Sequence, residues 1–179
     1  MSIRRFIAAA LIRAVERKAG QSMDYLRDIN AATPGGIWKF FMFVPFAAHG
    51  AKADAEMLAM GRIAACRNED CGPCLQIVVD TAIEAGVDPT LVQAAANGAV
   101  NELPELPRLA FEFGRAVASA THESEGIRLK LSQQLSKETM TNLAISIATA
   151  RVFPSLKRGL GHNRTCKTVQ IMDMVAKGT

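Results

Sequence analysis

Apolar residues recur along this chain at intervals of three and four positions, the spacing of one face of an α-helix. Most arginines of the first twenty residues lie off that face, and Gly20 stands where a helix commonly ends. The apolar positions that share the face are Ile3, Phe6, Ile7, Ala10, Leu11, Ala14 and Val15. Alternating patterns typical of β-strands are scarce. The pattern therefore predicts an all-α fold.

Breakers and capping residues divide the rest of the chain into further helices. A helix over residues 23–32 is expected to end before the breaker Pro34-Gly35-Gly36. Asp88 joins a capping side chain to Pro89 at the first helical position, and Ser136 is a suitable cap for the last long helix. Further helices are expected at 51–66, 71–85, 107–119, 123–135, 137–160 and, near the end of the chain, 165–176.

These elements predict one helical-bundle domain. We expect an N-terminal helical extension over residues 1–50, a helical core over 51–161, and a tail or helix over 162–179. The chain has 179 residues, of which 49% are hydrophobic and 21% charged, values ordinary for a globular domain.

The net charge and the lengths of the apolar runs argue against nucleic-acid binding and against a membrane span. The net charge is +4, no basic stripe is present, and one Trp and one Tyr offer little for base stacking, so nucleic-acid binding is not expected. The most apolar run, residues 37–48, is too short to span a bilayer and contains Lys39 and Pro45.

The beginning of the chain combines basic and apolar residues, which raises the question of a signal peptide. Arg13 interrupts the apolar run, and no convincing small-residue cleavage site follows. We therefore expect a cytoplasmic location with reduced thiols. We expect the basic first helix to contact a partner subunit in a homo-oligomer rather than an anionic membrane surface.

The chemistry of the sequence concentrates in Cys71-Gly72-Pro73-Cys74, at the predicted start of a helix. Unpaired backbone N–H groups at a helix N-terminus favour a thiolate over a thiol. Cys71 is therefore predicted to be the nucleophile, and Cys74, one turn deeper, the resolving thiol of a thiol–disulfide cycle.

Two other interpretations of the cysteines stay open. The pair could be buried thiols without chemistry. A structural zinc site could also form from Cys66, Cys71 and Cys74 with His162 or Cys166, although no second CxxC is present. The histidines are isolated in the sequence and are not predicted to be catalytic; they are His49, His122 and His162.

The stretch from Glu56 to Gly98, EMLAMGRIAACRNEDCGPCLQIVVDTAIEAGVDPTLVQAAANG, resembles the core of the carboxymuconolactone decarboxylase and alkyl hydroperoxidase-D-like proteins. A helix with a glutamate, a CxxC opening the next helix, an "AGV" turn and a short Leu/Ala helix follow in the family's order. Later segments extend the resemblance to residues 51–161. It implies an all-α fold, a dimer, trimer or hexamer, and reduction of peroxides or disulfides by the paired cysteines. We expect such a reaction to need an external thiol reductant but no bound cofactor or metal.

The resemblance also assigns roles and shows one departure. The family's upstream glutamate corresponds to Glu56, which becomes the expected proton relay. The peroxidase members carry a histidine four positions after the second cysteine, where this chain has Val78. Peroxide reduction needs a proton for the leaving oxygen, so Glu56, Glu69, Asp70 or water would have to supply it.

The sequence therefore predicts a thiol–disulfide oxidoreductase acting through Cys71, Cys74 and Glu56, with reduction of alkyl hydroperoxides as a weaker activity. The alternatives are a lyase of the lactone decarboxylase type, whose members often lack the cysteine pair, and a non-catalytic oligomeric or zinc-binding helical module.

Overall fold

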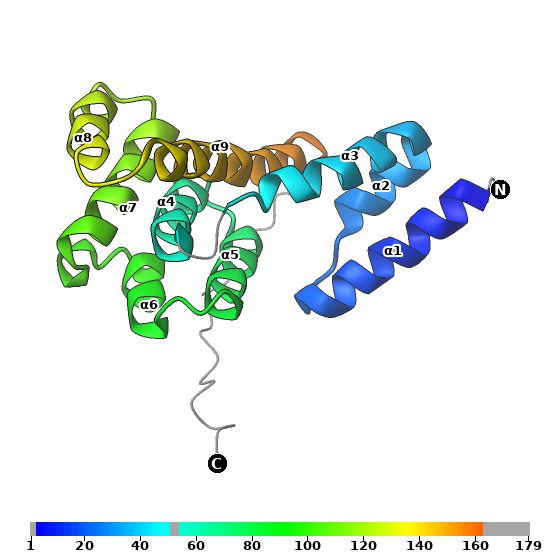
Figure 1. Ribbon diagram of the computed structural model, residues 1–179. Helices are drawn as coiled ribbons and strands as arrows, with labels where there is room; N and C mark the ends of the chain where they lie inside the picture. Colours follow the sequence, from blue (N-terminus) through cyan, green and yellow to red (C-terminus); the bar gives the residue numbers. More distant parts are fainter. Residues whose placement is uncertain (1–2, 51–53, 163–179) are drawn as a thin grey trace, which may run out of the picture.

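The computed structural model describes residues 3–50 and 54–162, and all regular structure in these ranges is helical, as predicted (Figure 1). The helices are α1 (Ile3–Ala19), α2 (Asp24–Ala32), α3 (Pro34–Ala47), α4 (Ala55–Asn68), α5 (Gly72–Glu84), α6 (Pro89–Asn97), the 3-10 helix η2 (Val100–Glu102), α7 (Glu105–Ala118), α8 (Glu123–Ser132) and α9 (Lys137–Gly159). The helix expected at 165–176 and Cys166 lie outside the described residues.

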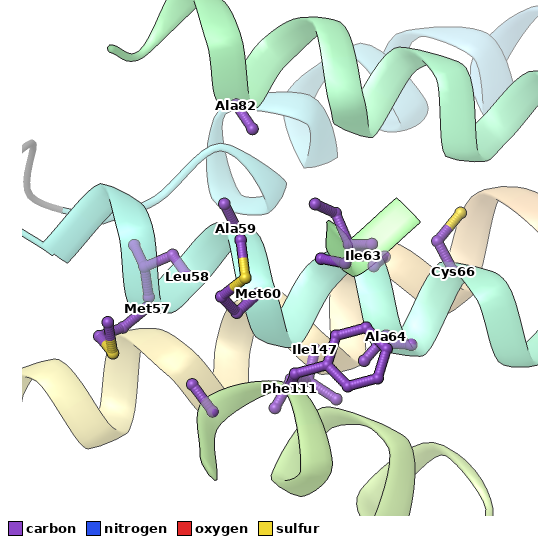
Figure 2. Close-up of a cluster of buried hydrophobic side chains, with 14 of the residues drawn as sticks. Met57, Leu58, Ala59, Met60, Ile63, Ala64, Cys66, Ala82, Phe111 and Ile147 are labelled. Atoms are coloured by element: carbon purple, nitrogen blue, oxygen red, sulfur yellow. The ribbon is translucent and has the colours of Figure 1, made fainter. Parts of the chain in front are cut away.

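Helix α4 lies at the centre of the larger of two hydrophobic cores. It contacts α5, α6, α7 and α9, and its residues from Met57 to Cys66 are buried apart from Arg62. Figure 2 shows side chains of α4 directed both toward α5, where Ala82 lies, and toward Phe111 and Ile147 on the other side. A helix that is apolar around most of its circumference has to be covered on all sides, and here four helices provide that cover.

The first three helices form a smaller core beside the larger one (Figure 1). Its buried side chains are Ala8, Ile12, Met23, Tyr25, Leu26 and Ile37. Ile77 of α5 and Leu156 of α9 pack against the same cluster, so the smaller core is joined to the larger one along these two helices. The site described below lies along this junction.

Two of the predicted helix starts have the expected capping bonds. Asp88 Oδ1 accepts a hydrogen bond from Thr90 N at 2.8 Å, and Ser136 Oγ accepts one from Thr139 N at 3.0 Å. The segment Pro34-Gly35-Gly36 behaves differently from its prediction as a breaker. Helix α2 ends before it, but Pro34 opens α3, where its missing N–H is not needed, and both glycines lie in the first turn.

The predicted apolar face of α1 points outward, while Ala8 and Ile12 face the smaller core. Its large side chains are exposed by 40–76%; they are Ile3, Phe6, Ile7, Leu11 and Val15. Within the described ranges, no helix is long and apolar enough to cross a bilayer.

Candidate active site

Cys71 and Cys74 lie where α4 and α5 meet. Cys71 is the residue that precedes α5, Pro73 lies in the first turn of that helix, and the two cysteines are joined as a disulfide with their Cα atoms 5.3 Å apart. Cys71 is half-buried, whereas Cys74 is only 5% exposed. An incoming reactant would therefore meet Cys71 first, as the order of attack predicted from the sequence requires.

The connection before Cys71 is fixed to α9 through Glu69. This carboxylate accepts a hydrogen bond from Arg151 Nε at 2.9 Å and forms a second ion pair with Arg158, which also donates to the Glu69 carbonyl oxygen at 3.2 Å. Burial alone would raise the pKa of Glu69, but the two arginines outweigh it and hold the pKa below its usual value. Because the paired carboxylate stays ionised, Glu69 is poorly suited to donate a proton.

The N-terminal helices reach the same turn from the other side. Gln21, between α1 and α2, donates a hydrogen bond from Nε2 to the Pro73 carbonyl oxygen at 2.8 Å. The backbone of the CxxC segment is therefore hydrogen-bonded directly to the connection between α1 and α2. The neighbouring Glu69 is bonded to α9. The positions of the α1–α2 connection and of α9 therefore help to determine the orientation of the Cys71–Cys74 disulfide.

A cavity of about 490 Å³ extends from Cys74 between the N-terminal helices and the larger core. Its wall is mainly apolar, and Val78, at the family's histidine position, is part of it. The aromatic side chains in the wall are Tyr25, Phe40, Phe41 and Phe153. A mostly apolar cavity of this size, with few polar groups, is typical of small-molecule sites.

The polar part of the cavity wall contains a third cysteine and, besides the exposed Lys18, two further cations. Cys66 is buried, and Figure 2 shows its sulfur on the side of α4 that faces α5. Burial raises the pKa of the Cys66 thiol to about 12, and the nearby Lys157 only partly opposes this. Lys157 Nζ lies 5.2 Å from the centre of the Tyr25 ring, and Arg62 Nε donates to Ser146 Oγ at 2.9 Å. The sequence offered no signal for Lys157 or Arg62 beyond their positions in helices.

Glu56 is not brought to the dithiol. It lies in the first turn of α4, whereas Cys71 follows the last turn, and the twelve residue steps from Glu56 to Asn68 rise by about 18 Å along the helix. Glu56 is also not among the residues of the cavity wall. The arrangement within one chain therefore gives no support to Glu56 as the proton relay.

Within residues 3–50 and 54–162, no histidine forms a hydrogen bond or ion pair with Cys71 or Cys74. His49 and His122 are exposed. His162 Nε2 lies 2.6 Å from Asp28 Oδ2, where it joins the end of α9 to α2. In the part of the chain that the structure describes, no three His, Cys, Asp or Glu side chains are grouped so that they could hold a metal ion.

Comparisons of the chain with protein-family models, with curated proteins and with solved structures returned no match. The resemblance to the carboxymuconolactone decarboxylase and alkyl hydroperoxidase-D-like proteins is therefore carried by the sequence motifs alone.

Proposed function

We propose that this protein is a thiol–disulfide oxidoreductase that uses Cys71 as the nucleophile and Cys74 as the resolving thiol. One observation supports the proposal most directly: the two cysteines are within bonding reach at the start of α5, with the first more exposed than the second. A helix N-terminus stabilises the thiolate that Cys71 would carry after reduction.

The reaction begins with the reduced protein. The Cys71 thiolate attacks one sulfur of a substrate disulfide, so that a Cys71–substrate S–S bond forms and the other substrate sulfur leaves as a thiolate. Cys74 then loses its proton and attacks Cys71 Sγ, which releases the second substrate thiol and leaves the Cys71–Cys74 disulfide. Two electrons pass to the substrate, and an external dithiol returns them by the reverse exchange.

Disulfides are the favoured substrates because a thiolate can leave without a proton. An alkyl hydroperoxide would oxidise Cys71 to a sulfenic acid and release an alcohol, whose oxygen needs a proton. The groups near the cysteines supply protons poorly, since Val78 replaces the histidine and Glu69 is held ionised by two arginines. Hydroperoxide reduction is therefore proposed as the slower activity.

The test uses the pre-reduced protein with glutathione disulfide and, separately, with cumene hydroperoxide. We expect Cys71→Ser to abolish both reactions and Cys74→Ser to accumulate a mixed disulfide that mass spectrometry detects. Cys66→Ala is the matched control, because this buried thiol is not part of the proposed cycle, and Glu56→Gln should also retain the wild-type rate. A Cys71→Ser protein as active as the wild type would show that the proposal is wrong.

A further inference from the structure

The cavity beside Cys74 has two chemically different parts. Most of its wall is formed by aromatic and aliphatic side chains of α2, α3, α5 and α9, while Lys157, Arg62 and the exposed Lys18 add cationic groups. Lys157 is only 7% exposed. An apolar space with a cation in its wall matches a molecule that has an apolar body and a single negative charge.

Two of these cations, Lys157 and Arg62, are not neutralised by acidic side chains of the described residues. Among the described residues, neither Lys157 nor Arg62 forms an ion pair; Lys157 contacts the Tyr25 ring, and Arg62 donates to Ser146 Oγ and to the Ala47 carbonyl oxygen. Burial lowers the pKa of Lys157, which indicates that its charge is poorly solvated. A buried cation without a counter-ion is costly, and a bound anion would relieve that cost.

The acidic residues in the cavity wall lie on α5 and have partners of their own. Asp80 accepts a hydrogen bond from Gln76 Nε2 at 2.8 Å, and Glu84 lies 3.4 Å from Lys18 in an exposed ion pair. Cys66 faces Lys157, but burial keeps its thiol protonated and therefore neutral at physiological pH. The charge around Lys157 thus favours an anion, and not a cation or a neutral ligand.

We infer that this cavity binds a medium- or long-chain monocarboxylic acid, with the carboxylate beside Lys157 and the alkyl chain along the aromatic wall. The cavity volume of about 490 Å³ is in the range of known small-molecule sites. The inference goes beyond the proposed redox function, because binding of the acid needs neither Cys71 nor Cys74 to react.

The experiment compares dodecanoate, tetradecanoate and hexadecanoate with the primary alcohols of equal chain length, titrated calorimetrically into the full-length protein. We expect saturable binding, an affinity that rises about fourfold for each added methylene until the cavity is full, and acids that bind at least about tenfold more tightly than the alcohols. Absence of saturable binding, or equal affinities for acid and alcohol, would overturn the inference.

Three lysine variants assign the preference to one side chain. Lys157→Met should remove the preference for the acid and leave the affinity for the alcohol unchanged, which also shows that the cavity is intact. Lys157→Arg should keep the preference, and Lys130→Met, at an exposed position on α8, should change nothing. Preference for the acid that persists in Lys157→Met, or that is lost in Lys157→Arg, contradicts the assignment.

The variant Cys71→Ser separates this inference from the proposed function, because Cys71, unlike Cys74, is not part of the cavity wall. It should bind the acids as the wild type does, although it lacks the dithiol. If the wild-type protein binds acids but does not catalyse disulfide exchange, the proposed function alone is refuted. If the wild-type protein catalyses disulfide exchange but does not bind acids, the cavity inference alone is refuted.

Discussion

The Cys66 thiol is held protonated by its surroundings, and this has a consequence for stability at alkaline pH. Its pKa is raised to about 12 in the folded protein, mainly by burial, whereas an unfolded cysteine ionises near pH 9. Below pH 9 both states keep the proton. Between pH 9 and 12 only the unfolded state loses it, so the free energy of unfolding falls as the pH rises.

We expect Cys66→Ala to remove this part of the pH dependence. The wild type should lose about 1.4 kcal/mol of unfolding free energy per pH unit above pH 9 that the variant does not lose. Urea unfolding of both proteins at pH 8.0, 9.5 and 10.0 measures the difference; Tyr25, whose pKa is also raised to about 12, contributes equally to both. Parallel curves over this range would mean that Cys66 is solvated in the native state.

Lys157 provides a second prediction, in which stability and binding change in opposite directions. Burial lowers its pKa, so below the unfolded pKa its charge weakens the fold, and the contact with the Tyr25 ring compensates for part of that loss. In the absence of a ligand, Lys157→Met should raise the free energy of unfolding by about 1 kcal/mol at pH 7.

The gain from Lys157→Met should shrink as the pH rises toward 10.5, because the wild-type lysine then becomes neutral in both states. Thermal unfolding at pH 7 and pH 10 checks this. A variant that is less stable than the wild type at pH 7 would show that the contact with Tyr25 outweighs the cost of burial, and the argument for a missing counter-ion would be weakened.

Lys157 also shows which structural property could not be predicted from the sequence, namely its burial. Lys157 has the appearance of an ordinary basic residue in the last turn of a helix, which the helix dipole favours. In the fold it is buried and lies against the ring of Tyr25, which is more than a hundred positions earlier in the chain. Local spacing predicts which residues share a face of a helix, but not which distant element will cover that face. The CxxC pair, by contrast, is local, and its proximity was predictable.

At the scale of elements, α4 and α7 approach closely at two glycines. A Cβ atom added to Gly114 would lie 2.4 Å from the Gly61 carbonyl oxygen and 2.8 Å from its Cα atom, and the backbone of α4 cannot yield as a flexible side chain would. Neither glycine was recognised in the sequence as a contact, because the residues that meet are 53 positions apart, and a glycine within a helix usually indicates only a weaker helix.

Gly114→Ala should therefore destabilise the protein by about 1–3 kcal/mol, despite the better helix propensity of alanine. Gly126→Ala in α8 is the matched control, since a Cβ atom there meets nothing within 4 Å, and it should stabilise the protein by about 0.5–1 kcal/mol. Urea denaturation of both variants measures the contrast. Equal effects at the two positions would show that α4 and α7 adjust without cost.

The helix boundaries were predictable where a side chain caps its own helix. Asp88 and Ser136 bond to N–H groups two and three residues later, so the signal lies entirely within the local sequence. The helix boundary at Pro34-Gly35-Gly36 was harder to predict, because a proline is compatible both with a break and with the first turn of a helix. Packing of Ile37 into the smaller core favours the helix.

At the scale of the whole molecule, the exposed apolar face of α1 is the surface on which we expect the subunit interface of a homo-oligomer to lie. Five large apolar side chains lie along it, while Ala8 and Ile12, on another side of the helix, are buried in the smaller core. Contiguous apolar surface of this kind commonly marks a protein–protein interface. We therefore expect the α1 faces of two copies to pack together, with the charged residues of α1 at the edge of the contact.

Leu11→Glu tests this location against a matched change elsewhere. Leu11 is 42% exposed on α1, and Leu129 is 49% exposed on α8, so the same substitution introduces the same charge at a similarly exposed leucine. If α1 forms the interface, Leu11→Glu should raise the dissociation constant of the oligomer about tenfold or more, because an apolar contact is replaced by a desolvated carboxylate. Leu129→Glu should leave it unchanged.

Sedimentation equilibrium over a hundredfold range of concentration distinguishes these outcomes. If both variants associate as the wild type does, or if the wild type is monomeric throughout, the face on α1 is not a subunit interface. Val15 belongs both to this face and to the cavity wall, so association through α1 should also change the affinity for a carboxylic acid with protein concentration.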